Sequence, residues 1–503
     1  MIEIDGGHLS IEDVVAVARN KAKVSISKMA IANIEKSRGK VEKVLKEGKV
    51  VYGINTGFGE LSNVRISDNE IEKLQENLIR SHACGVGDEL PDEIVRAMML
   101  LRANSLAKGY SGVTLTLVQK LIDGLNRGFH PVVPSQGSVG ASGDLVPLAH
   151  IALAFMGEGM ANYNGVKMPA MEALERAEIS PVTYKAKEGL ALINGTQMMT
   201  AIASLAVNDA YLLLKNAQVA GVMSLEALKG TDQVFREEIN NARPYNGQIN
   251  IGKNLWKLTR NSKIIASHKN CPKVQDAYTL RCMPQVFGAA RDSLDHIKKI
   301  IEVEINSATD NPLVFDDIIS GGNFHGEPIA IAMDLLGIVA TKIGSFSERR
   351  TARLLDSNLS GLPHFLAKEA GLNSGLMILQ YVAASLVNEN KTLAYPSSVD
   401  SIPTSANKED YQSMGATSAR KARIIITNTE RIVSIEFITS SQALEFHELK
   451  PSRAVSTAYK CIRGKIPPHE EDRAMYTDIE TAFKMVHEGE IINAVEDEVG
   501  ELL

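Results

Sequence analysis

Cysteine is scarce in this chain, and the few cysteines are widely spaced. The four are Cys84, Cys271, Cys282 and Cys461. They include no Cys-x-x-Cys pair, so the spacing favours neither a disulfide framework nor a zinc site. This usage is typical of a reducing compartment, and we expect a cytoplasmic protein.

An excess of charge of one sign is also missing. The chain carries 54 basic and 60 acidic residues, a net charge of −6, and the two signs are interspersed. This pattern predicts neither a nucleic-acid partner nor a membrane-surface partner. Residues 1–5 hold early acids and no basic segment before an apolar one, which argues against a signal peptide. The apolar stretch 189–208 is interrupted by polar residues at 194–197, so we expect a buried site segment rather than a membrane span.

Strand-forming runs are few, and residues 50–52 and 165–168 are the best candidates. Helical patterns are expected over 10–19, 27–47, 68–82, 92–108 and 114–127 and, at greater length, over 197–229, 284–307, 328–355, 374–391 and 411–449. The last run would extend over about 55 Å, and only a large bundle or an oligomer buries a helix that long. We predict a mainly α fold with a loop-rich domain over 1–195 and a long-helix bundle with closing helices over 196–503.

Residues 137–143 read Gly-Ser-Val-Gly-Ala-Ser-Gly and carry the most information. Such segments are usually flexible loops, but this one matches neither a phosphate-binding pattern nor a nucleophile elbow. A tight bend permits other chemistry, in which the amide nitrogen of Gly143 attacks the carbonyl carbon of Ala141 and a water is lost. Loss of the Ser142 hydroxyl as a second water leaves an exocyclic alkene. The product, methylidene-imidazolone, is an electrophile that no ordinary side chain provides.

Other polar segments carry groups that an amine-eliminating site needs. Tyr52 lies in the three-glycine segment 51–59, and its phenol acts as a base only where neighbours favour the phenolate; the alternative is a turn with a packed aromatic. His82 closes a predicted helix, where a histidine also serves as a simple cap. Asn194 is an amide in an apolar segment and needs partners, which a substrate or a backbone turn would supply.

The segment 274–282 places Gln275, Tyr278 and Arg281 at helical spacing, on one side of a short helix. Arg281 is suited to bidentate capture of a carboxylate, although a surface salt bridge is the alternative. His325-x-Glu327 is one part of a zinc deaminase motif, but the Pro-Cys-x-x-Cys partner and any His-Glu-x-x-His are absent. We therefore predict no metal and no nucleotide cofactor.

Together these segments resemble the histidine ammonia-lyase family, within the wider group of aromatic amino acid ammonia-lyases and aminomutases. The resemblance runs from Tyr52 to about Met414, and Gly-Ala-Ser-Gly-Asp-Leu around the tripeptide is its most specific part. It implies a fumarase/aspartase-like helical architecture and a homotetramer with shared active sites. It also implies that Ala141, Ser142 and Gly143 form the electrophile and that Tyr52 removes the substrate β-proton. The other implied site residues, which hold the amine, carboxylate and ring, are Asn194, Gln275, Tyr278, Arg281, Phe324, His82 and Glu409.

His82 and Glu409, which match positions facing the substrate side chain, set the expected substrate. An imidazole ring satisfies both groups, whereas a phenyl ring would leave Glu409 desolvated and unpaired. The expected reaction is elimination of ammonia from L-histidine to give trans-urocanate, the first step of histidine degradation. Lys408, Tyr411 and Arg80 depart from the glutamine, histidine and apolar residue that the family leads us to expect. The alternatives are a tyrosine or phenylalanine ammonia-lyase, an aminomutase, and a catalytically silent helical scaffold.

Overall fold

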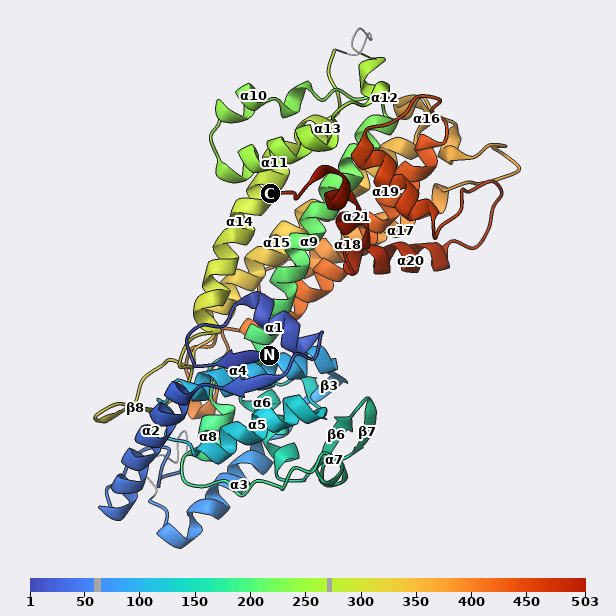
Figure 1. Ribbon diagram of the computed structural model, residues 1–503. Coiled ribbons are helices and arrows are strands. Elements are labelled where there is room, and N and C mark those ends of the chain that lie inside the picture. Colours follow the sequence, from blue (N-terminus) through green and yellow to red (C-terminus); the bar gives the residue numbers. More distant parts are fainter. Residues whose placement is uncertain (58–64, 269–273) are drawn as a thin grey trace. The chain divides into compact units, whose positions relative to one another are not determined.

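The computed structural model describes residues 1–57, 65–268 and 274–503 (Figure 1). Cys271, and Phe58 and Gly59 of the predicted glycine-rich segment, lie outside the described residues. The chain divides into two compact units. Unit 1 comprises Met1–Asn208, Lys298–Asp334 and Pro396–Arg420, and unit 2 comprises Asp209–Ile297, Leu335–Tyr395 and Lys421–Leu503. The domain boundary at residue 195 stays a prediction.

Unit 1 is built from short helices and small sheets. Its helices are α1 (Ile11–Ala18), α2 (Lys28–Lys46), η2 (Asp68–Glu70), α3 (Ile71–His82), α4 (Asp92–Ala107), α5 (Leu115–Arg127), α6 (Leu145–Phe155), α7 (Ala170–Arg176), α8 (Glu188–Ile193) and η5 (Ser405–Asn407). Its strands are β1 (Ile2–Ile4), β2 (Val24–Ile26), β3 (Val86–Glu89), β4 (Phe129–Pro131), β5 (Pro134–Gln136), β6 (Met160–Tyr163), β7 (Val166–Pro169), β8 (Leu313–Val314) and β9 (Ile318–Ile319). β1 and β2 pair in parallel, and the pairs β3–β5, β4–β6, β6–β7 and β8–β9 are antiparallel.

Several helices of unit 1 begin and end where the sequence supplies capping residues. Ser10 and Asp13 form a reciprocal capping box at the start of α1. Ser27 and Thr114 accept backbone hydrogen bonds at the starts of α2 and α5. Gly128 ends α5 in the left-handed conformation, with φ +79°. The predicted helices over 10–19, 27–47 and 114–127 are confirmed within a residue or two at each end.

α4 is the central helix of unit 1. All its residues from Ile94 to Ala107 are buried, and it packs against α1, α5 and α2. Burial on every side explains why this helix shows no clear apolar face. Two arginines, Arg96 and Arg102, are nevertheless among its buried side chains. Their cations must therefore be satisfied inside the protein.

Unit 2 contains helices of very different lengths. The shorter ones are η3 (Gln233–Phe235), α10 (Glu237–Asn241), α11 (Asn246–Leu258), α12 (Lys263–Ala266), α13 (Tyr278–Arg281), α16 (Ser357–Ser360), η4 (His364–Leu366), α17 (Met377–Leu393), α19 (Arg453–Arg463), α20 (Tyr476–His487) and α21 (Glu490–Val499). The long ones, α9 (Gln197–Ala227), α14 (Met283–Glu304), α15 (Glu327–Leu355) and α18 (Gly415–Leu444), have residues in both units.

Within unit 2 the long helices pack side by side (Figure 1). Phe287 of α14 and Phe346 of α15 meet edge to face with ring centroids 5.6 Å apart. Ser224 of α9 and Ser347 of α15 each donate a 2.6 Å hydrogen bond to Glu436 of α18. These contacts confirm the predicted mainly α fold with a bundle of long helices.

Two local predictions were wrong. Residues 50–52 do not form a strand, because Tyr52 lies in a turn held by hydrogen bonds from the amides of Ile54 and Asn55 to the carbonyl of Val51. The helix predicted over 411–449 begins only at Gly415 and is about 45 Å long at 1.5 Å per residue. It begins late because Met414, with φ +55°, is held out of the helix by a hydrogen bond from its amide to the Val139 carbonyl.

Two helices, α9 and α15, are long and apolar enough to cross a membrane by length and composition alone. However, 78% and 67% of their most apolar windows are buried within the protein. Burial of this extent is what helices in a protein core show, so these helices are weak grounds for a membrane span.

Candidate active site

The tripeptide 141–143 lies in a tight bend just before α6. Gly143 has φ +73° and forms an isolated parallel bridge with Gly195. The amide of the next residue, Asp144, donates a 2.6 Å hydrogen bond to the Gly195 carbonyl. Ala141 is 4% exposed, whereas Ser142 is only partly buried. The tight bend that ring closure requires is therefore present, and Ser142 is its partly exposed residue.

The space around this bend admits no side chain at its glycines. A Cβ on Gly143 would lie 2.3 Å from the Gly195 carbonyl oxygen, and one on Gly140 would lie 2.3 Å from Oγ of Ser413. Ser413 also donates a 2.9 Å hydrogen bond to the Gly140 carbonyl. Because glycine alone fits and tolerates positive φ at 143, the residues present are compatible with ring closure between 141 and 143.

Asp144 is a site residue that the sequence reasoning missed. Its carboxylate accepts hydrogen bonds from the amide of Met199 at 2.9 Å and from Oγ of Ser138 at 2.7 Å. Burial raises the pKa of Asp144 to about 6, and these hydrogen bonds oppose the rise. The carboxylate thereby ties the tripeptide loop to the first turn of α9. Its position directly after the tripeptide is the one sequence feature that could have indicated this role.

Glu409 lies directly at the tripeptide. Its Oε1 accepts a 3.2 Å hydrogen bond from Oγ of Ser142, and its Oε2 accepts one of 3.2 Å from Thr404. Gln412 donates 2.9 Å hydrogen bonds to Oγ1 of Thr404 and to the Glu409 carbonyl. The segment 404–413 therefore holds the carboxylate in place. Thr404 and Gln412 were not predicted, since nothing in their local pattern distinguishes them.

His82 is the last residue of α3, as predicted. Its Nδ1 lies 2.9 Å from the Leu78 carbonyl oxygen, which matches the capping alternative. Burial lowers the pKa of His82, while the Leu78 carbonyl and the charge of Glu409 both oppose the change. The imidazole of His82 is thus held at the helix end and also interacts electrostatically with the Glu409 carboxylate.

Asn194 ends α8 and is 3% exposed. Its Nδ2 donates a 3.1 Å hydrogen bond to the Asn311 carbonyl, while its buried Oδ1 has no partner among the residues that the structure describes. Tyr52 is half-buried, and a Cβ on the adjacent Gly53 would lie 2.9 Å from Pro312. The tyrosine turn and Asn194 therefore both pack against segment 311–312.

Phe324 lies in a loop that contacts the tripeptide loop. Two residues later, the amide of Gly326 donates a 3.1 Å hydrogen bond to the Gly140 carbonyl. Phe324 is half-buried, and the ring of the following His325 stacks on Tyr411 with centroids 6.1 Å apart. The stack joins the loop that carries Phe324 to the segment that carries Glu409.

The three departures from the family pattern differ in their surroundings. Tyr411 supplies the stack with His325, and Lys408 is exposed. Arg80 is engaged at the surface, where its guanidinium lies 2.7 Å from Glu158 and 3.4 Å from Glu76. These contacts give Arg80 a structural role at the surface, two positions before His82 in α3.

Gln275, Tyr278 and Arg281 belong to unit 2, whereas the tripeptide belongs to unit 1. The guanidinium of Arg281 lies 4.7 Å from the centre of the Tyr278 ring, as their spacing predicted. Gln275, however, precedes α13 rather than sharing it, because this helix begins only at Tyr278. Tyr278 is 69% exposed, and the buried Nε of Arg281 has no hydrogen-bond partner within the described chain.

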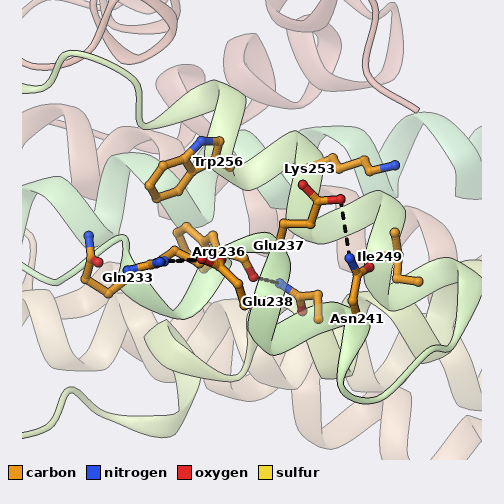
Figure 2. Close-up of a pocket in the computed structure, with 10 residues that line it drawn as sticks. Gln233, Arg236, Glu237, Glu238, Asn241, Ile249, Lys253 and Trp256 are labelled. Atoms are coloured by element: carbon orange, nitrogen blue, oxygen red, sulfur yellow. Dashed lines mark hydrogen bonds and ion pairs between the residues drawn. The ribbon is translucent and has the colours of Figure 1, made fainter.

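Unit 2 contains a cavity of about 370 Å³, and none of the predicted site residues lines it. Figure 2 shows the residues that line this cavity. Its charged groups largely pair with one another: Arg236 bonds to Glu238, and Asn241 donates to Glu237 at 3.3 Å. The cavity therefore adds nothing to the predicted constellation. In the described parts of the chain, no group of three or more His, Cys, Asp or Glu side chains is placed to hold a metal ion.

The chain is similar to known proteins along nearly its whole length. The family described as aromatic amino acid lyase matches residues 9–464. Histidine ammonia-lyase of Caldanaerobacter subterraneus subsp. tengcongensis is 51% identical over 99% of this chain and 98% of the relative. The structure of histidine ammonia-lyase from Trypanosoma cruzi matches with a TM-score of 0.92 and 41% identity, over 99% of this chain and 96% of that one. Tyrosine aminomutase from Streptomyces globisporus matches with a TM-score of 0.94 and 37% identity over 100% of both chains.

Proposed function

This chain belongs to the aromatic amino acid lyase family, and from that premise we propose that it eliminates ammonia from L-histidine to give trans-urocanate. It is a carbon–nitrogen lyase. Relatives named histidine ammonia-lyase are about as similar to it in two further bacteria, with 50% identity in both Alkaliphilus oremlandii and Myxococcus xanthus. We further propose that it works as a soluble cytoplasmic enzyme.

The proposed cofactor is made from the chain itself. The Gly143 nitrogen bonds to the Ala141 carbonyl carbon, whose oxygen leaves as water with the amide protons of Ser142 and Gly143. The Ser142 hydroxyl then leaves as a second water with the Cα proton of the same residue, which creates the alkene. The tight bend at Gly143 and the close approach of Gly195 support this step. The resulting methylidene-imidazolone supplies an electrophile that makes the substrate nitrogen a better leaving group.

The proposed base is Tyr52, which removes the β-proton of the substrate. Its turn packs against segment 311–312, which also binds Asn194. The unpartnered Oδ1 of Asn194 is free to accept a hydrogen bond from the substrate amine. Phe324, on the loop that bonds to Gly140, is proposed to pack beside the tripeptide.

Substrate choice is proposed to rest on Glu409 and His82. Glu409 already contacts Ser142, so its carboxylate lies where the side chain of a bound amino acid must be recognised. An imidazole N–H donates to this carboxylate, whereas a phenyl ring would leave it desolvated without a partner. This contrast favours histidine over phenylalanine.

The substrate carboxylate is proposed to bind Arg281, with Gln275 and Tyr278 beside it. These residues lie in unit 2, and we propose that a neighbouring copy of the chain supplies them in a homotetramer with shared active sites. The exposed Tyr278 and the unpartnered Nε of Arg281 support a site that another chain completes. Sedimentation that shows an active monomer would overturn this assembly.

The single observation that carries the proposal is the bent Ala141-Ser142-Gly143 loop with Glu409 on its serine. Ser142→Ala has no hydroxyl to lose as the second water and is expected not to cyclise, so its intact mass should equal that calculated for the unmodified variant, whereas the unaltered chain should lose about 36 Da. Turnover of histidine to urocanate, followed by its absorbance, should fall to background. Ser180→Ala, at an exposed serine that bonds to Lys120, is the matched control and should cyclise normally. Full activity of Ser142→Ala would refute the proposed chemistry.

An aminomutase is the second candidate, because tyrosine aminomutase is also structurally similar over the full chain. Such an enzyme would return the amine to the β-carbon instead of releasing ammonia. Product analysis by NMR after incubation with histidine, tyrosine and phenylalanine separates the two. A β-amino acid product in place of urocanate and free ammonia would favour the aminomutase.

A further inference from the structure

Segment 194–197 lies against the tripeptide, and we propose that Arg102 of α4 is the positioning residue that holds this segment rigid while the ring closes. The proposal rests on the proposed function, because it concerns formation of the proposed cofactor. It assigns Arg102 no contact with the substrate. Its role is to prevent the Gly195 main chain from moving while the Gly143 nitrogen approaches the Ala141 carbonyl carbon.

Arg102 connects three separate segments of the chain, two through main-chain carbonyls and one through a side chain. Its Nη1 donates to Oε1 of Gln197 at 2.9 Å and to the Thr309 carbonyl at 3.0 Å. Its Nη2 donates to the Ala191 carbonyl. Gln197 adds a 2.7 Å hydrogen bond from its own Nε2 to Oγ1 of Thr309. The end of α8, the start of α9 and residue 309 are therefore fixed to one guanidinium.

Gly195 is enclosed between this guanidinium and the tripeptide. A Cβ on Gly195 would lie 2.3 Å from Nη1 of Arg102, so the guanidinium packs directly against the Gly195 backbone. The Gly195 carbonyl in turn contacts Gly143 and accepts the Asp144 amide at 2.6 Å. Arg102, Gly195 and Gly143 thus form a continuous series of close contacts. A bend compressed against this series cannot relax by moving Gly195 backward.

The electrostatic setting of Arg102 makes its burial costly. It is 1% exposed, and its hydrogen bonds within the described residues go to carbonyl and side-chain amide oxygens. The nearby Asp310 carboxylate is bound to Lys187 at 2.8 Å. Burial lowers the pKa of Arg102 to about 10, with Asp310 opposing, so the group stays charged at neutral pH. A buried cation without a paired anion is costly, and packed apolar residues are often more stable in such places.

The same helix offers a matched control in Arg96. This arginine is 2% exposed and donates to the carbonyls of Val17 and Leu125, so it is also a buried cation on main-chain acceptors. Its hydrogen-bond partners among the described residues lie outside segment 194–197. Its replacement therefore tests the general cost of losing a buried arginine from α4, without disturbing Gly195.

The experiment follows ring closure in newly synthesised full-length chains by intact mass over time. For Arg102→Lys and Arg102→Met we expect loss of the two waters to slow at least about tenfold, which corresponds to ~1.4 kcal/mol of barrier. Arg96→Lys and Arg96→Met should close the ring at the rate of the unaltered chain, even where their melting temperatures fall. Near-ultraviolet absorbance of the finished ring provides a second readout that a purely structural role would not change.

The outcomes separate the inference from the proposed function. If the unaltered chain never loses two waters, the proposed function itself is wrong. If it does, but the Arg102 variants close at the same rate, or the Arg96 variants are slowed equally, the inference is overturned. Should both Arg102 variants fail to fold, Gln197→Ala decides the matter, since it removes one acceptor of Arg102 and the link to Thr309. Slow closure in folded Gln197→Ala supports the inference, and normal closure overturns it.

Discussion

Ser142 donates a 3.2 Å hydrogen bond to Glu409, although 267 positions separate the two residues along the chain. The contact joins the hydroxyl that must be lost during ring closure to the carboxylate that is proposed to recognise the substrate. Both residues lie in unit 1, on separate segments that are also connected through Ser413 and Gly140. The residues of the proposed electrophile and of the proposed substrate recognition therefore belong to one local framework.

Glu409→Gln is expected to lower kcat/KM for histidine by about tenfold to a hundredfold, because a hydrogen bond to a charged acceptor contributes ~1.5–3 kcal/mol. The amide retains the shape of the side chain but not its charge. Steady-state assays with histidine and phenylalanine would measure the change. The ratio of kcat/KM for histidine to that for phenylalanine should decrease. Intact mass serves as the control, since the variant must still cyclise. An unchanged kcat/KM in fully cyclised enzyme would contradict the assignment.

Gly143→Ala should block ring closure, because the added Cβ would lie 2.3 Å from the Gly195 oxygen at a φ of +73°. Gly165→Ala is the matched control: its φ is +84°, but no atom lies within 4 Å of the new Cβ. The control should lose only ~1 kcal/mol of stability from the left-handed backbone and should cyclise fully. Melting temperature and intact mass distinguish the two effects. Complete ring closure in Gly143→Ala would show that the contact with Gly195 is not limiting.

The sequence made a specific prediction for the tripeptide but none for the residues that hold it in place. Gly140-Ala141-Ser142-Gly143 is informative because ring closure depends on residues that are neighbours in the chain. Asp144 was missed although it is adjacent, since its partner Met199 becomes visible only after folding. Arg102 was missed because a buried arginine within an apolar helix resembles a surface residue until burial is known.

The fold shows the same division between local and distant signals. Helices with their own caps, such as the one begun by Ser10 and Asp13, were predicted closely. The hairpin of β6 and β7 turns at Asn164 and Gly165. Asn-Gly is typical of a two-residue hairpin turn, but the sequence analysis did not predict a hairpin from it. The start of α18 could not be found, because the Met414 amide bonds to a carbonyl at position 139, far away in the sequence.

Glu226→Gln should raise stability at alkaline pH. Burial raises the pKa of Glu226 from 4.5 to about 7, and Ser262 and Ser452 oppose the rise by hydrogen bonding. Below pH 4.5 the group is protonated in the folded and unfolded states and contributes no pH dependence. Between 4.5 and 7 the unfolded chain releases its proton first, so stability falls as pH rises, by on the order of 3 kcal/mol.

The glutamine variant lacks this titration, so its advantage over the unaltered chain should grow from pH 4.5 to 7 and then stay constant. Chemical unfolding across this range would measure it, with Glu471→Gln at an exposed position as control. Parallel pH profiles for the Glu226→Gln variant and the unaltered chain would show that the buried carboxyl is not a source of the dependence.

Lys187→Met is expected to lower the free energy of unfolding by ~3–5 kcal/mol, because it leaves the Asp310 carboxylate buried without its cation. Both side chains are 0% exposed, and the ion pair distance is 2.8 Å. The double variant Lys187→Met with Asp310→Leu should recover most of this loss, since no uncompensated charge then remains. Lys368→Met, which breaks a surface pair with Glu470, should cost less than ~1 kcal/mol. Urea unfolding at one fixed protein concentration measures the free energy of unfolding of all three variants. If the double variant is less stable than Lys187→Met alone, Asp310 stabilises the fold through other hydrogen bonds, such as the one that it accepts from the Asn311 amide.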